Sequence, residues 1–117
     1  MKKRQLNSYD VHMKELYDTI HEARDRLIAK TQAVITKKAV IDLYPEGADK
    51  QAAIKTLDDA KFSLLCAIGY YDGRLNEACQ YYTNNYNNFS QYWATPNCYA
   101  KSHDIIEIAY RDYFKKN

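Results

Sequence analysis

The amino-acid sequence predicts an all-α protein, built from a long antiparallel helical hairpin with a shorter third helix. Three glycines and two prolines in 117 residues leave room for few turns. Apolar residues recur at steps of three and four over two long stretches, which is the period of a helical face. One strong break, at Pro45 and Gly47, separates these stretches. We therefore expect a single helical domain spanning residues 1–117.

The first helix is expected over residues 8–43. Ser8 is a candidate N-cap, and Asp10 carries the charge that complements the helix dipole in the first turn. A heptad-like apolar seam follows, with charged residues on the opposite face. The seam comprises Tyr9, Met13, Leu16, Ile20, Ala23, Leu27, Val34 and Ile41.

A tight connection at residues 44–49 should make the next helix antiparallel to the first. Pro45 cannot continue the first helix, and Gly47 can adopt a positive φ. The second helix is expected over residues 48–90, weakening near the asparagines of 84–88. Its apolar stripe comprises Leu57, Ala60, Leu64, Ile68, Tyr71, Leu75, Ala78, Tyr82, Tyr86, Phe89 and Trp93.

Gly69 and Gly73 interrupt this second stretch. The stripe keeps its phase across them, which favours one continuous helix in which the paired glycines allow another backbone to approach closely. A break at Gly69–Gly73, where Asp72-Gly73 is also a turn signal, would instead give four helices.

The third helix is expected over residues 97–115, after Thr95-Pro96, and the whole would form a three-helix bundle. One short helix would leave part of the hairpin's apolar seam uncovered. We therefore expect a homodimer or a protein partner.

Composition limits the function classes. The chain has seventeen basic and fifteen acidic residues, a net charge of +2. This near balance does not indicate binding to nucleic acid or to an anionic membrane. No secretory signal opens the chain, and no apolar run is long enough to cross a bilayer. The odd count of three cysteines argues against a disulfide framework and favours buried thiols. A cytoplasmic protein without a membrane segment is expected.

No pattern of a catalytic site or of a cofactor site is present. The chain lacks a nucleophile elbow and a phosphate-binding loop. Histidine and carboxylates share helical faces at Asp18, His21 and Glu22 and at His103 and Glu107, but Glu-x-x-His does not occur. We expect no catalytic residue, no metal and no cofactor.

The best functional lead is the charge-free segment 78–100, which is rich in tyrosine and asparagine. Tyr70, Tyr81 and Tyr92 are eleven residues apart and would share one helical face, about 100° away from the main stripe. Tyrosine, tryptophan and arginine dominate the hot spots of protein interfaces. The predicted partner-binding residues are Tyr70, Arg74, Tyr81, Asn88, Tyr92 and Trp93. The open alternative is that the third helix covers this face.

Three functions follow. The first is a non-enzymatic protein-interaction module: a small inhibitor, an immunity-type protein or an adaptor that binds a larger protein. A composition rich in Asn, Tyr and Lys is associated with AT-rich bacterial or phage and other mobile-element sources, where such inhibitors are common. The second is a nucleic-acid binder or transcriptional regulator, which requires the basic residues to converge in space. The third is a small helical enzyme or metalloprotein, which requires histidines and carboxylates from two helices to meet.

Overall fold

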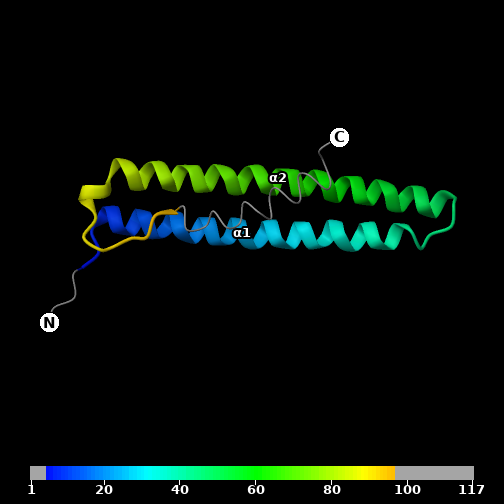
Figure 1. The fold of residues 1–117 in the computed structure, drawn as a ribbon, viewed down its shortest axis with the longest axis horizontal. Coiled ribbons are helices and arrows are strands. Elements are labelled where there is room, and N and C mark those ends of the chain that lie inside the picture. Colours follow the sequence, from blue (N-terminus) through cyan, green and yellow to red (C-terminus); the bar gives the residue numbers. More distant parts are fainter. Residues whose placement is uncertain (1–4, 97–117) are drawn as a thin grey trace.

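The computed structural model describes residues 5–96, and this part of the chain is a helical hairpin without strands (Figure 1). Helix α1 spans Ser8–Ile41 and helix α2 spans Ala48–Asn84, followed by a short 3-10 turn, η1, at Tyr86–Asn88. The all-α class and the antiparallel hairpin are confirmed. The third helix expected over 97–115 lies outside the described residues. The molecule is elongated, with principal extents of 69 × 29 × 18 Å.

Helix α1 begins with a capping box. The N-cap is Asn7 rather than the predicted Ser8: its side chain accepts a hydrogen bond from the backbone N–H of Asp10 at 2.9 Å. The carboxylate of Asp10 in turn accepts one from the backbone N–H of Asn7 at 3.0 Å. This reciprocal pair satisfies two of the donors left without partners at a helix start.

The connection between the helices turns on Gly47, whose φ of 148° is the only positive one among the described residues. L-residues with a side chain rarely adopt this conformation, so a glycine is required here. The Gly47 carbonyl accepts the first bond of α2, from the N–H of Gln51 at 3.1 Å. The role predicted for Gly47 is confirmed.

Helix α2 runs without a break through Gly69 and Gly73, so the four-helix alternative is wrong. No described residue makes the close approach predicted at these glycines, because a Cβ built at either position meets no atom within 4 Å; approach by another backbone stays a prediction. The helix ends at Asn84, inside the asparagine run and before the expected end near residue 90. Asn85 stops it there: both its backbone N–H and its side-chain amide donate to the Tyr81 carbonyl.

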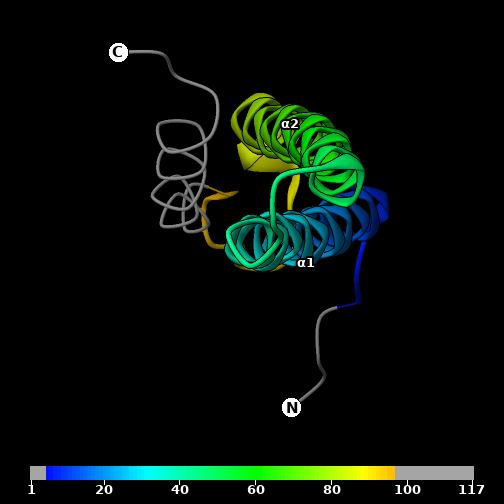
Figure 2. The same ribbon diagram turned by 90° about the vertical axis from the view of Figure 1, so that its right-hand side faces the viewer.

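The core lies along the seam between α1 and α2, which Figure 2 shows end-on. The predicted stripes supply it almost completely, because residues at helical spacing from both helices pack together. Its buried members are Met13, Leu16, Ile20, Ala23, Leu27 and Val34 from α1, and Leu57, Leu64, Ala67, Tyr71, Leu75 and Ala78 from α2.

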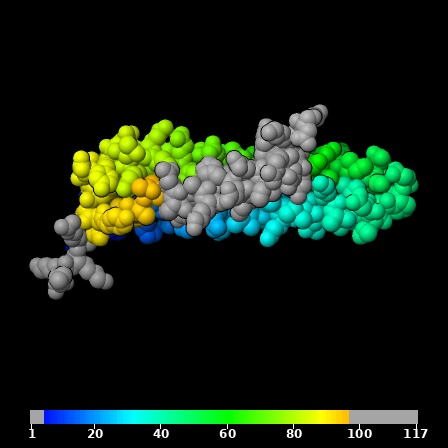
Figure 3. All heavy atoms as spheres, in the orientation of Figure 1, coloured from blue at the N-terminus to red at the C-terminus, as the bar shows by residue number. Residues whose placement is uncertain are grey.

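Apolar side chains also remain exposed on the hairpin. Leu43 at the tip is 81% exposed, and Phe62 on the outer side of α2 is 68% exposed. Figure 3 shows this tip at the opposite end of the molecule from the chain segment that follows α2. Neither described helix carries an apolar stretch of the length needed to cross a membrane.

Candidate functional site

The segment that follows α2 folds back across the start of α1 (Figure 1). We call residues 85–96 the strap. The strap is held by one carboxylate, that of Asp10, which is 0% exposed. Beyond its capping bond to Asn7, Asp10 accepts hydrogen bonds from the backbone N–H groups of Ser90 and Gln91, both at 3.2 Å. It also accepts one from the Ser90 hydroxyl and one from the Trp93 indole at 2.8 Å.

These donors decide the ionisation of Asp10. Burial alone raises the pKa of a carboxyl, because desolvation disfavours the charged form. The hydrogen bonds from Ser90 and Trp93, with backbone bonds from Asn7 and Ser90, outweigh burial and hold the pKa of Asp10 well below its usual range. The strap is therefore fastened by a buried negative charge that is fully compensated by hydrogen-bond donors.

Aromatic rings pack around the strap, at the end of the hairpin opposite its turn. The Tyr17 and Trp93 rings stack with their centroids 5.6 Å apart, and the Tyr17 hydroxyl donates to the Ala94 carbonyl. The Tyr81 ring meets the edge of His12 at 4.4 Å and lies 6.1 Å from Phe89. Burial, reinforced by the nearby Tyr9 and Asp10, raises the pKa of the Tyr81 phenol. Much of the charge-free aromatic segment thus packs within the molecule.

A second feature is a hollow of about 610 Å³ between α1 and α2, near the middle of the hairpin. Its described lining is Arg26, Lys30, Ser63, Cys66, Ala67 and Tyr70. The guanidinium carbons of Arg26 and Arg74 lie 5.1 Å and 5.5 Å from the centre of the Tyr70 ring. A cation over a tyrosine face is held by the ring quadrupole, so the three side chains form one unit.

A separate hollow of about 300 Å³ lies nearer the tip and is lined by Thr36, Lys37, Val40, Tyr44, Ala53 and Thr56. Lys37 lies two helical turns beyond Lys30, and Thr56 two turns from Ser63, so both hollows fall on one face of the hairpin. We call this face the cationic groove. The described linings of its two hollows contain no carboxylate; Asp49 lines a separate hollow at the tip.

Carboxylates stand at the outer rim of the groove. Glu22 contacts Arg26 at 3.2 Å, and Glu77 contacts Arg74 at 3.1 Å. Both glutamates and both arginines are substantially exposed, and such pairs contribute little to stability. Within the described residues the Nε of Arg74 is buried without a hydrogen-bond partner. The guanidinium groups themselves remain partly exposed, so a ligand can still contact them.

The six predicted site residues lie in three places. Tyr70 lines the cationic groove, and Arg74 lies over the Tyr70 ring beside it. Tyr81, Trp93 and the backbone of Asn88 help to fasten the strap, the Asn88 carbonyl accepting a bond of 2.8 Å from the Asn7 side chain. Tyr92 is 94% exposed and lies beyond the end of α2. The expectation that Tyr70, Tyr81 and Tyr92 share one helical face is therefore wrong, because the helix ends before the third ring.

The structure also locates several of the residues considered as metal ligands or as buried thiols. Asp18, His21 and Glu22 lie on α1, but no three histidine, cysteine, aspartate or glutamate side chains within residues 5–96 come together as a metal site. His103 and Glu107 lie outside the described residues. Cys66 is an exposed free thiol, contrary to the expectation of a buried one.

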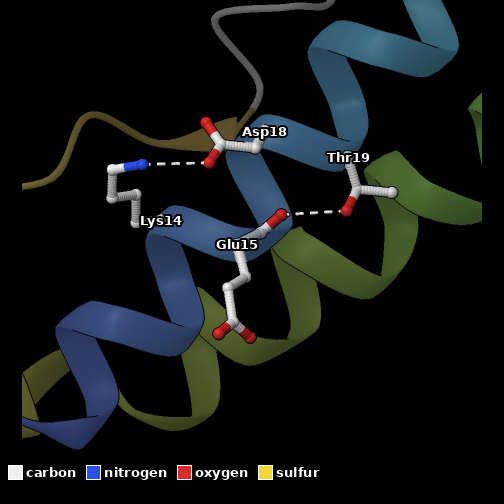
Figure 4. Close-up of polar contacts among 4 residues, drawn as sticks. All are labelled: Lys14, Glu15, Asp18 and Thr19. Atoms are coloured by element: carbon white, nitrogen blue, oxygen red, sulfur yellow. Dashed lines mark hydrogen bonds and ion pairs between the residues drawn. The ribbon is translucent and has the colours of Figure 1, made fainter.

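Four residues near the start of α1 make polar contacts within their own helix. Lys14 pairs with Asp18 at 3.0 Å, and the Thr19 hydroxyl donates to the Glu15 carbonyl at 2.9 Å (Figure 4). Such i,i+4 contacts are typical of a solvated helix surface. The cationic groove differs from this surface, because side chains of both helices converge in the groove.

Comparison with known proteins gives no match to a family model, to a curated protein or to a solved structure. The function is therefore argued from the residues of the chain itself.

Sequence reasoning missed Asp10 as the anchor of the strap and Arg26, Lys30 and Lys37 as groove residues. A signal existed for the lysines, which interrupt the apolar seam of α1 at a spacing of seven and so mark one edge of that seam. No comparable signal marked Asp10, because its bonds to Ser90 and Trp93 span 80 and 83 residues.

Proposed function

We propose that this protein is a non-enzymatic protein-interaction module, of the kind represented by small inhibitors, immunity-type proteins and adaptors, that binds a larger protein. The observation that carries the proposal is the cluster of Arg26, Tyr70 and Arg74, in which two guanidinium groups lie over one tyrosine ring beside an open hollow. Arginine and tyrosine are the residue types that dominate interface energetics.

The position of the cluster supports the proposal. Tyr70 is 39% exposed, so its ring can still lose accessible surface when a partner binds. The two arginines hold the ring in place before binding, which lowers the entropy lost on association. The exposed thiol of Cys66 beside this cluster suits a reducing compartment, so we place the proposed activity in the cytoplasm.

The test compares capture of partners by the full-length protein and by its Tyr70→Ala variant. Crosslinking in the native host, followed by mass spectrometry, should identify a protein that the wild type captures and Tyr70→Ala loses. Phe62→Ala is the matched control, because Phe62 is an exposed aromatic residue of α2 outside the described lining of both hollows. Equal capture by all three proteins, each with unchanged helicity, would refute the assignment of the surface.

A nucleic-acid-binding function is the second candidate, and the same cluster favours it. Cations beside an aromatic ring form the platform on which single-stranded bases stack. Binding of this kind weakens steeply as salt rises, because neutralising phosphates releases counterions. Titration with DNA and RNA oligonucleotides at two salt concentrations separates the candidates: salt-sensitive binding lost in Tyr70→Ala would support the second.

A further inference from the structure

The shape of the cationic groove matches an elongated ligand. It follows the seam between two long antiparallel helices, and its α2 wall runs from Ala53 to Tyr70, a rise of about 26 Å at 1.5 Å per residue. That length corresponds to about five turns of helix.

The α2 wall consists largely of small side chains. Ser63 and Ala67 line the larger hollow, and Ala53 and Thr56 line the smaller one. Small residues at a helix surface let a neighbouring helix axis approach to about 8–10 Å. The groove between two helices is also where a third helix packs in a bundle.

The α1 wall supplies the charge. Arg26, Lys30 and Lys37 follow one another at spacings of four and seven residues, which places all three on the same helical face. Neither lysine forms an ion pair with another described residue. The described linings of the two hollows contain no acidic residue; the one described carboxylate paired with these cations is Glu22, whose exposed contact with Arg26 at 3.2 Å a partner's carboxylate can replace. A ligand that enters it gains by carrying carboxylates at the same spacing.

We propose, building on the proposed function, that the cationic groove is the docking site for an acidic amphipathic helix of the partner protein. The helix lies along the seam between α1 and α2, and its carboxylates face Arg26, Lys30 and Lys37. An apolar or small-residue stripe on the same helix packs on Ala67 and the Tyr70 ring. This is the helix-in-groove mode of recognition, here selected by charge.

The groove suits a helix better than a single-stranded nucleic acid. A stacking platform presents several successive aromatic rings. Tyr70 is the one aromatic side chain in the described lining of the larger hollow, and Tyr44 is the one in that of the smaller hollow, near the opposite end of the hairpin. The cations therefore face a surface of small residues and hydroxyl groups over most of the length.

The test uses a designed peptide of about 18 residues with glutamates at spacings of four and seven on one face and with alanine and leucine beside them. Binding to the full-length protein is measured by fluorescence anisotropy at low salt. The charge-reversed variant Lys30→Glu/Lys37→Glu should bind at least about tenfold more weakly, because two attractions become repulsions. The control Lys14→Glu/Lys55→Glu makes the same change of net charge on exposed lysines outside the described groove linings and should bind as the wild type does.

A charge swap guards against misfolding as the cause. A second peptide, with lysine in place of each glutamate, should bind Lys30→Glu/Lys37→Glu better than it binds the wild type. The proposal is overturned if the acidic peptide does not bind, if both double variants bind it equally, or if an oligothymidylate alone binds in a manner sensitive to the reversal. If the peptide test fails but capture of a protein still depends on Tyr70, the docking of an acidic helix is refuted and the proposed function stands. The two outcomes are distinguishable because capture and peptide binding are measured separately.

Discussion

The indole Nε1 of Trp93 donates a hydrogen bond of 2.8 Å to the carboxylate of Asp10, and this bond joins the strap to the first turn of α1. Asp10 is at once the third residue of a helix and the acceptor for a segment 80 to 83 residues away. Two kinds of structure, a local helix cap and a long-range contact, therefore depend on one buried charge.

Replacing Asp10 by Asn should loosen the strap. An amide has one acceptor oxygen, and its NH₂ group would face the donors of Ser90 or Trp93. We expect the midpoint of thermal unfolding, followed by circular dichroism, to fall by on the order of 10 °C. Asp18→Asn is the control: Asp18 belongs to an exposed pair with Lys14, and its replacement should shift the midpoint little. Equal shifts in the two variants would contradict the role assigned to Asp10.

The same carboxylate predicts a dependence of stability on pH. The pKa of Asp10 is depressed in the folded protein, so its contribution is complete above the ordinary value of 3.8 and is lost as pH falls toward the folded pKa. The difference in unfolding free energy between wild type and Asp10→Asn should therefore be constant from pH 7 to about pH 5 and should shrink below about pH 4. Urea titrations at each pH measure it. A difference that grows in acid would have the wrong sign.

Trp93 is the only tryptophan of the chain, so its fluorescence reports on the strap alone. Trp93→Phe removes the hydrogen bond to Asp10 but keeps a ring against Tyr17, and Trp93→Ala removes both. We expect Trp93→Phe to cost about 1–3 kcal/mol of stability, as for loss of a bond to a charged group, and Trp93→Ala to cost more. Chemical denaturation followed by far-ultraviolet circular dichroism measures both. Equal costs would show that the stacking on Tyr17 contributes nothing.

A cavity made in the core between α1 and α2 should lower the free energy of unfolding. Leu64 is fully buried, so Leu64→Ala should lower the free energy of unfolding by about 2–5 kcal/mol. The neighbouring Leu65 is 41% exposed, and Leu65→Ala should change it by less than about 1 kcal/mol. Urea denaturation of the pair provides the comparison. A larger effect at Leu65 would place the seam on the wrong face of α2.

Gly69 and Gly73 offer a stabilising change. A Cβ at either position meets no described atom within 4 Å, and both lie inside a continuous helix. Gly73→Ala should therefore raise the free energy of unfolding by about 0.5–1 kcal/mol, because alanine loses less backbone entropy in a helix. Sedimentation velocity on the same variant tests close packing of a second copy on this face. Destabilisation together with loss of a dimer would show that the glycines do serve a close approach.

The hairpin could be predicted because its causes are local. The seven-residue spacing of Leu57, Leu64 and Tyr71 describes a helix face that any antiparallel neighbour would cover, and Pro45 with Gly47 marks the turn. The end of α2 was harder to place. The apolar stripe continues in phase to Phe89 and Trp93, so periodicity alone extends the helix, whereas the side chain of Asn85 ends it.

The candidate site could be predicted only in part for the same reason. Tyr70 and Arg74 share a helix, so their proximity follows from the sequence. Arg26 reaches the same ring from α1, which depends on the register between the two helices. Tyr81 and Trp93 were assigned to a binding surface because of their residue types. The ring of Tyr81 contacts His12 and the indole of Trp93 donates to Asp10, so both lie against α1.

The capping box of α1 also affects the order in which the chain folds during its synthesis on the ribosome. Residues 90–93 are synthesised long after Asp10, yet they supply the donors that neutralise its buried charge. The first turn of α1 is therefore completed by a segment that leaves the exit tunnel some 80 residues later. This end of the hairpin reaches its final structure only after most of the hairpin has been translated.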